Sequence, residues 1–210
     1  MKRIRTWLIC RKLGIKKYTY NKDGSIDVHT SVYLNNLGTS KKLENLPIKF
    51  NIIDGSFSCQ NNNLSSFDNF PKTINGQLDM SNNNFVSLKG CPHVVGNYTR
   101  AHINCSGNNI LSFEGLKYEL FHRITLSNNP INNIWNLFRD STLLDLFNDY
   151  DIVRDDGELN MYRLDKFLED NGYQPIQRHQ WRIFKGYKVI EYPNKRRSGK
   201  RFKNGLKKMK

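Results

Sequence analysis

One 11-residue pattern occurs four times in the middle of the chain, at residues 57–67, 78–88, 103–113 and 124–134. Each copy has apolar residues at positions 1, 3, 8 and 11 and asparagine at position 6. The copies begin 21, 25 and 21 residues apart. A single copy is too short to bury its own apolar side chains, so we expect the copies to stack side by side.

The spacing is that of the leucine-rich-repeat frame, LxLxxNxLxxL. Positions 1 and 3 lie on the same side of a short strand and are expected to point inward. The four position-6 asparagines are predicted to stack as a ladder whose side-chain amides satisfy backbone groups of adjacent coils. They are Asn62, Asn83, Asn108 and Asn129. Residues 32–46 contain an imperfect earlier copy.

Coils of about 21 residues leave too few residues for a full helix on the return side, where Pro and Gly recur. The sequence therefore predicts an α/β solenoid, a short leucine-rich repeat with a turn-rich convex face, closed by a helix-hairpin cap at its N-terminus and a small α+β cap at its C-terminus. The expected parts are a basic helix and hairpin cap at 1–31, the solenoid at 32–138, the C-terminal cap at 139–192 and a basic flexible tail at 193–210.

Local signals support the two caps. An apolar stretch at 6–13 predicts a short helix, and turn residues at 21–24 lie between two strand-like segments. Downstream, Ser141 is a good N-cap for a helix, a second helix is expected at 159–170, and residues 187–192 resemble a strand.

The net charge of +14 is concentrated at the two ends of the chain. Residues 1–17 carry seven Lys or Arg and residues 193–210 carry nine, with no acidic residue in either segment, so the rest is nearly neutral. Such arms would attract nucleic acid or an acidic protein without sequence specificity, and a solubilising tail is an equal alternative. The candidate polyanion-binding residues are Lys195, Arg196, Arg197, Lys200, Arg201, Lys203, Lys207, Lys208 and Lys210.

Several segments resemble leucine-rich-repeat proteins that tailed bacteriophages encode. They are DGSIDV at 23–28, LENLPIKF at 43–50, SNNPINNIWNLF at 127–138, LFNDYDIV at 146–153 and RLDKFLEDNG at 163–172. The resemblance covers residues 14–190 and implies a family of undetermined function. Some of its members are likened to bacterial ubiquitin-ligase effectors, whose nucleophilic cysteine follows the repeats. Because no cysteine follows Cys105, we expect no ligase activity.

Metal and catalytic sites find little support in the sequence. Cys91, His93, His102 and Cys105 lie within 15 residues, but Cys105 is expected to point inward and His102 outward, so we predict no zinc site. The acidic segments 148–151 and 155–158 lack the spacing of a calcium loop and are interpreted as turns. No phosphate-binding loop and no hydrolase motif occurs. We therefore expect neither an enzyme nor a cofactor.

The remaining candidate site is the predicted concave face. Its residues are Ser58, Gln60, Asp79, Ser81, His102, Asn104, Arg123 and Thr125. They are mostly small, and only Arg123 and His102 resemble interface anchors. The first hypothesis is a noncatalytic scaffold that binds a protein partner, and the alternative is a nucleic-acid-associated protein bound through its basic arms.

The chain lacks a stretch of about 20 apolar residues and a signal peptide, so we expect no membrane contact and no export by that route. Four cysteines in a chain of this length suggest reduced thiols. The expected location is the cytoplasm of an infected host cell or the virion. The oligomeric state stays open.

Overall fold

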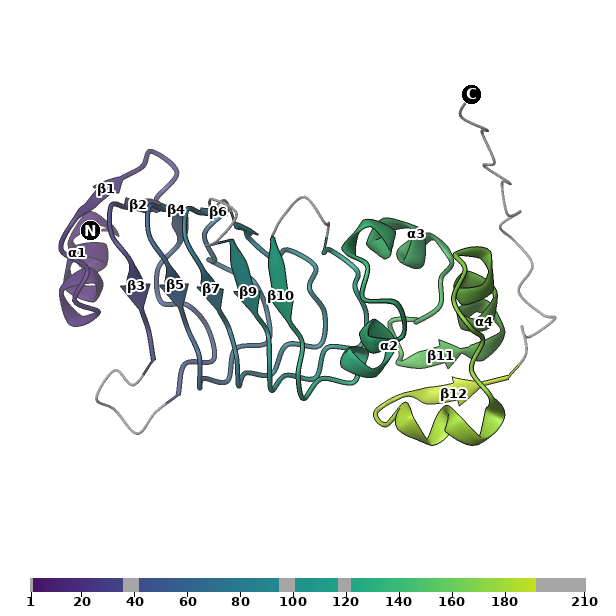
Figure 1. The fold of residues 1–210 in the computed structure, drawn as a ribbon. Coiled ribbons are helices and arrows are strands. Elements are labelled where there is room, and N and C mark those ends of the chain that lie inside the picture. The colour runs from purple at the N-terminus through teal and green to yellow at the C-terminus, as the bar shows by residue number, and fades with distance from the viewer. Residues whose placement is uncertain (1, 36–41, 95–100, 117–121, 192–210) are drawn as a thin grey trace, which may run out of the picture.

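The chain forms a β-solenoid of stacked parallel strands, seen side by side in Figure 1. The computed structural model describes residues 2–35, 42–94, 101–116 and 122–191. Within them, five strands form what we call sheet 1, in the order β10-β9-β7-β5-β3. They are β3 (Val32–Tyr33), β5 (Phe57–Ser58), β7 (Leu78–Asp79), β9 (His102–Asn104) and β10 (Arg123–Thr125).

Sheet 2 lies on the return side of the coils and has the order β1-β2-β4-β6-β8. Its strands are β1 (Tyr18–Tyr20), β2 (Ile26–Val28), β4 (Phe50–Ile53), β6 (Thr73–Ile74) and β8 (His93–Val94). From β2 to β9 the chain alternates between the two sheets, so each turn of the solenoid adds one strand to each. Short strands replace helices on this side, as expected from the coil length.

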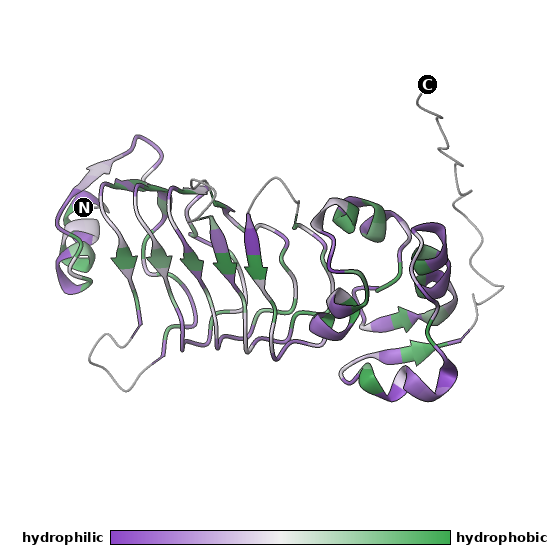
Figure 2. Cartoon of the chain, in the orientation of Figure 1, coloured by the Kyte–Doolittle hydropathy of each residue, from purple (hydrophilic) through white to green (hydrophobic). Residues whose placement is uncertain are grey.

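The strand register stacks equivalent repeat positions. Val32 pairs with Phe57, Phe57 with Leu78, Leu78 with Ile103, and Ile103 with Ile124. These position-1 side chains point into the solenoid, and all but the half-buried Ile124 are buried. Hydrophobic and hydrophilic residues alternate along the strands of sheet 1 (Figure 2). Burial of this continuous apolar row is the main force holding the coils together.

The position-6 asparagines lie buried in one row and connect the coils. Asn83 accepts a hydrogen bond at Oδ1 from the Leu64 amide, 3.0 Å away, and donates from Nδ2 to the carbonyls of Cys59 and Met80 at 3.0 and 3.1 Å. The other three repeat this pattern one coil apart. Each amide therefore satisfies a donor and a carbonyl of the preceding coil.

At the N-terminal end, α1 (Lys2–Lys12) precedes the β1–β2 hairpin, which has the antiparallel pairing expected for residues 18–28. The helix begins four residues earlier than expected. Cys10 and Ile15 anchor this region to the core, and both are buried.

At the other end, α2 (Ile131–Phe138), η2 (Ser141–Leu143) and α3 (Leu144–Asp149) follow the last coil. Then come β11 (Glu158–Asn160), α4 (Met161–Asp170), η3 (Arg178–Ile183) and β12 (Lys188–Ile190), with β11 and β12 paired in parallel. Phe113 of the solenoid packs edge-on against Phe147 of α3, with ring centroids 5.1 Å apart. The apolar core thus continues from the solenoid into this end unit.

One local expectation at this end was wrong, and another was correct to within two residues. Asp140, not Ser141, caps the first helical segment, because its Oδ1 accepts from the Thr142 amide at 2.9 Å. The expected helix at 159–170 begins at Met161 instead, because Leu159 pairs with Val189 in the sheet and Asn160 serves as the N-cap. The predicted basic tail at 193–210 lies outside the described residues.

Candidate functional site: the outer face of sheet 1

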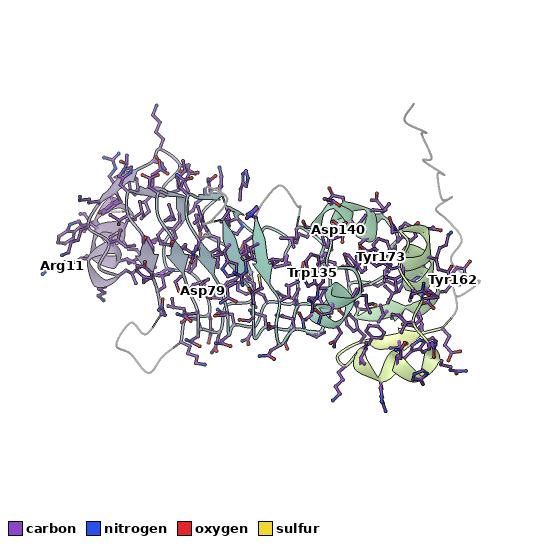
Figure 3. All side chains as sticks on the ribbon, viewed as in Figure 1. Arg11, Asp79, Trp135, Asp140, Tyr162 and Tyr173 are labelled. Atoms are coloured by element: carbon purple, nitrogen blue, oxygen red, sulfur yellow. The ribbon has the colours of Figure 1, made fainter. Side chains whose placement is uncertain are left out.

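Sheet 1 presents a polar outer face. Phe57 and Cys59 point inward, so the alternation of side chains along a strand places Ser58 outward. The register sets Tyr33, Ser58, Asp79, Asn104 and Thr125 in one row across the five strands. His102 and Arg123 form part of a second row before it, and Gln60 and Ser81 follow it. The structure therefore brings all eight predicted partner-binding residues to one face, with Asp79 near its centre (Figure 3).

One half of this face, over β7, β9 and β10, is internally hydrogen-bonded. Asp79 Oδ1 accepts from the Ser81 amide at 3.0 Å, from Ser81 Oγ at 2.7 Å and from Asn104 Nδ2 at 3.3 Å. His102 Nε2 and Thr125 Oγ1 lie 2.9 Å apart. Burial and the nearby Arg123 lower the pKa of His102, against a weaker opposite effect of Asp79. These side chains are held in place by one another.

The other half, over β3, β5 and β7, contains a pocket of about 250 Å³. Its lining residues are Tyr33, Asn35, Ser56, Phe57, Ser58, Gln60, Gln77 and Asp79. Ser58 is only 7% exposed, yet its Oγ has no hydrogen-bond partner in the described structure, and the same holds for Asn35 Oδ1. Beside them the ring of Tyr33 is 60% exposed.

The chemistry of this pocket favours ligands that donate hydrogen bonds. None of the lining residues is cationic, and Asp79 brings a carboxylate. Asn35 Oδ1 is an unused acceptor, and the Ser58 hydroxyl can donate or accept. The face of the Tyr33 ring attracts cations. A guanidinium, an ammonium or a row of amide N–H groups would match these groups.

Tyr33 and Asn35 were not among the residues expected at the site. Their signal was the imperfect copy at 32–46, which places Tyr33 in the frame position of Ser58. The sequence could align the two residues, but it could not show that the pocket opens at this end of the face and not near Arg123.

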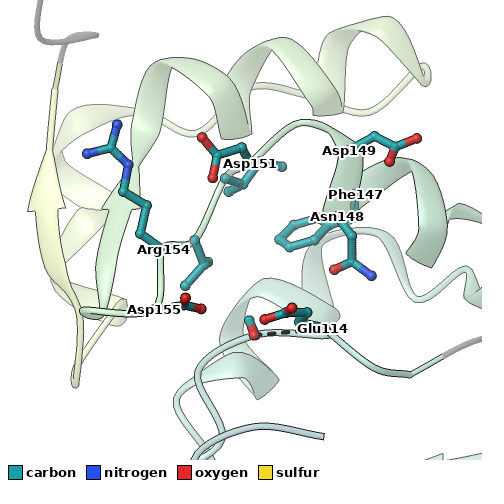
Figure 4. A pocket seen from close by; sticks show the side chains of 10 residues that line it. Glu114, Phe147, Asn148, Asp149, Asp151, Arg154 and Asp155 are labelled. Atoms are coloured by element: carbon teal, nitrogen blue, oxygen red, sulfur yellow. Dashed lines mark hydrogen bonds between the residues drawn. The ribbon is translucent and has the colours of Figure 1, made fainter. Parts of the chain in front are cut away.

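A second hollow, of about 520 Å³, lies between the solenoid and the end unit (Figure 4). Glu114, Asp149, Asp151 and Asp155 line it together with Arg154. Asp151 pairs with Arg163, and Arg154 pairs with Glu158 at 2.8 Å. The turn at Arg154 is closed by the Gly157 amide, which donates to the Arg154 carbonyl at 2.9 Å. In the described ranges no group of three or more His, Cys, Asp and Glu is arranged to hold a metal ion.

The cysteines are poorly suited to nucleophilic chemistry. Burial raises the pKa of Cys59 and Cys105 well above the usual value and that of Cys91 to about 12. The reactive thiolate is therefore disfavoured near neutral pH. His93 is exposed and His102 lies on the outer face of sheet 1, whereas Cys105 is buried inside.

The nine predicted polyanion-binding residues between Lys195 and Lys210 all lie outside the described residues. None of the helices in the described segments is long and apolar enough to cross a membrane. Comparison with known proteins gives no match to a family model, to a curated protein or to a solved structure.

Proposed function

We propose that this chain is a noncatalytic, protein-binding scaffold of the leucine-rich-repeat type, and that the outer face of sheet 1 holds an extended segment of its partner. The four in-register repeats and the row of buried asparagines support the repeat class. The observation that carries the binding role is the pocket at Tyr33, where two buried polar atoms have no partner.

Buried polar atoms without a hydrogen-bond partner destabilise the folded state. Each costs about 1 to 3 kcal/mol relative to a satisfied group, and most proteins contain few of them. A bound segment that donates to Asn35 Oδ1 and Ser58 Oγ would remove this cost. The exposed ring of Tyr33 would then be covered, as is typical of aromatic anchors at interfaces.

The internally bonded half of the face supports the same function in another way. Because Asp79, Asn104 and His102 are already fixed by neighbours, binding there would order few additional side chains. We expect this half to orient the partner and the Tyr33 pocket to supply most of the affinity.

Site-specific crosslinking tests the proposal. A photoreactive phenylalanine analogue placed at Tyr33 should capture a partner that the same analogue at Tyr162 of α4, an equally exposed tyrosine, does not. Titration of the recombinant partner should then show at least tenfold weaker binding by Tyr33→Ala and less than twofold change for Tyr162→Ala. Equal capture at both positions, or wild-type affinity of Tyr33→Ala, would reject the site.

The basic arms support the alternative, a nucleic-acid-associated protein. Binding to a nonspecific DNA duplex that collapses between low and moderate salt, and that vanishes when residues 193–210 are deleted, would favour this alternative. Partner capture that persists in nuclease-treated samples and in the truncated chain would favour the scaffold.

A further inference from the structure

Helix α1 has two apolar faces, and only one of them packs against the solenoid. The inner face carries Cys10, which is 1% exposed, and Ile9, which packs against the core cluster. The outer face carries Ile4, Trp7 and Leu8, which are 65%, 50% and 47% exposed. Their spacing of three and four residues aligns them on one side of the helix. A helix whose only role is to cover the end of a solenoid needs apolar residues on its inner face but not on its outer face.

Cations lie beside and on the outer apolar ridge. With about 100° between successive residues, Arg5 and Lys12 border the ridge beside Leu8, and Arg11 lies on the ridge between Ile4 and Trp7. All three are exposed, and the Arg11 guanidinium lies over the Trp7 ring, 5.7 Å from its centroid. The first acidic residue of the chain is Asp23, so no carboxylate of this segment neutralises them.

We expected no membrane contact because the sequence lacks a membrane-spanning stretch, but attachment at the surface does not need one. We propose that α1 binds the surface of an anionic lipid membrane, lying in the plane of the headgroups with Ile4, Trp7 and Leu8 inserted. Exposed apolar side chains, one of them an indole, next to Lys and Arg are features of helices that lie in the membrane interface. The long cationic side chains reach outward to the phosphates while their aliphatic stems stay on the apolar side.

Other occupants of the ridge fit these observations less well. A second copy of the chain would bring two equally basic helices together, which like-charge repulsion opposes. Nucleic acid would bind the cations through its phosphates, but contacts with Ile4 and Leu8 would add little to its affinity, since phosphate contacts dominate nonspecific binding. A lipid interface uses both kinds of side chain.

The position of α1 gives this attachment a structural consequence. The helix lies at the N-terminal end of the solenoid, opposite the end unit formed by α3 and α4 (Figure 1). Membrane contact through α1 would hold the protein by its end and leave β7, β9 and β10 of sheet 1 accessible to a partner. The inference rests on the side chains of α1 alone and does not use the proposed protein-binding function.

Vesicle binding by the full chain tests the proposal. We expect cosedimentation with vesicles of phosphatidylglycerol and phosphatidylcholine, and at least tenfold weaker binding to phosphatidylcholine alone. Ile4→Ser/Leu8→Ser should weaken binding to the mixed vesicles at least tenfold, although it changes no charge. The matched control Val86→Ser/Tyr162→Ser, which replaces two equally exposed apolar residues elsewhere, should bind as the wild type does.

Charge variants test the other half of the pattern. Arg5→Glu/Lys12→Glu should weaken binding at least tenfold, and more than Lys72→Glu/Lys185→Glu, which changes the net charge equally at exposed sites outside α1. Trp7 emission should shift to the blue on mixed vesicles, and Trp7→Phe should abolish that shift.

Three results would overturn the inference. The first is no preference for the mixed vesicles. The second is wild-type binding by Ile4→Ser/Leu8→Ser, which would mean that charge alone, including that of residues 193–210, attaches the protein. The third is capture of an acidic protein that needs Leu8, without any vesicle binding, which would make the ridge a protein-docking surface.

Discussion

Each position-6 asparagine satisfies backbone groups of two coils at once. The Oδ1 of Asn83, Asn108 and Asn129 accepts from the position-8 amide of the preceding repeat. Their Nδ2 donates to the position-3 carbonyl of that repeat and to carbonyls of their own coil. No other uncharged side chain except glutamine offers both a carbonyl acceptor and two donors, and the longer glutamine would not fit the same turn.

Asn83→Ala is therefore expected to destabilise the protein by about 3 kcal/mol, because it leaves a buried amide and buried carbonyls without partners. The neighbouring Asn84 is exposed, and Asn84→Ala should change the free energy of unfolding by less than about 0.5 kcal/mol. Urea unfolding of the two variants measures this difference. Similar losses for both would mean that the ladder does not hold the coils together.

At the scale of elements, the coils approach most closely at a column of small residues. A Cβ built on Gly76 would lie 2.8 Å from the backbone of Gly55, and one built on Gly55 would lie 2.6 Å from the Ser31 amide nitrogen. Gly55 and Gly76 occupy equivalent places in successive coils, two residues before β5 and β7, and Ser31 directly precedes β3. The absence of a side chain at the two glycines lets the strands of sheet 1 pair.

Gly76→Ala should therefore push two coils apart and destabilise the protein by about 1 to 3 kcal/mol. The adjacent Asn75 is exposed and its side chain donates to Asp54, while its backbone bond to Ile53 would survive the substitution, so Asn75→Ala should cost far less. Thermal unfolding followed by circular dichroism compares the two variants. A neutral Gly76→Ala would show that the coils can separate at this corner without loss.

The end unit is attached to the solenoid by a polar contact as well as by its aromatic core. The Tyr187 hydroxyl donates to the Leu111 carbonyl at 2.7 Å, and burial raises the pKa of Tyr187. Tyr187→Phe should cost about 1 to 2 kcal/mol, because the carbonyl of Leu111 loses its partner. Tyr162→Phe, at an exposed tyrosine, serves as the control, and hydrogen exchange should show faster opening of β11 and β12 only in the first variant.

At the scale of the whole molecule, the buried thiols make stability depend on pH. Burial keeps Cys59 and Cys105 protonated in the folded state, whereas their ordinary pKa is 9.0. Above that value the unfolded chain releases protons that the folded chain keeps, so stability falls as the pH rises. At one pH unit above it, each thiol contributes a loss of about 1.4 kcal/mol.

We expect the free energy of unfolding in urea to fall more steeply between pH 8 and pH 10 for the wild type than for Cys59→Ala/Cys105→Ala. Bonds to carboxylates also raise the pKa values of Lys89, Lys166 and Lys188, which lowers stability as the pH rises. This contribution is the same in the wild type and the variant, so it cancels when their pH profiles are compared. Parallel pH profiles would show that the two thiols ionise in the native state.

The sequence by itself determined the stacked architecture, because four copies of one pattern fix both the apolar row and the asparagine row. It also placed Ser58, Asp79, Asn104 and Thr125 on one face, since side chains alternate along a strand. Local propensity was less precise at the ends, where Leu159 pairs with Val189 and the helix expected from residue 159 begins at Met161.

Only the tertiary structure decided where on that face a pocket opens. Asp79 and Asn104 satisfy each other across neighbouring strands, whereas Ser58 and Asn35 find no partner, and this depends on distances between residues far apart in the chain. The same holds for α1, whose sequence contains five apolar side chains in one short helix. Packing against the core used Ile9 and Cys10 and left Ile4, Trp7 and Leu8 at the surface, because one helix can turn only one of its faces toward the solenoid.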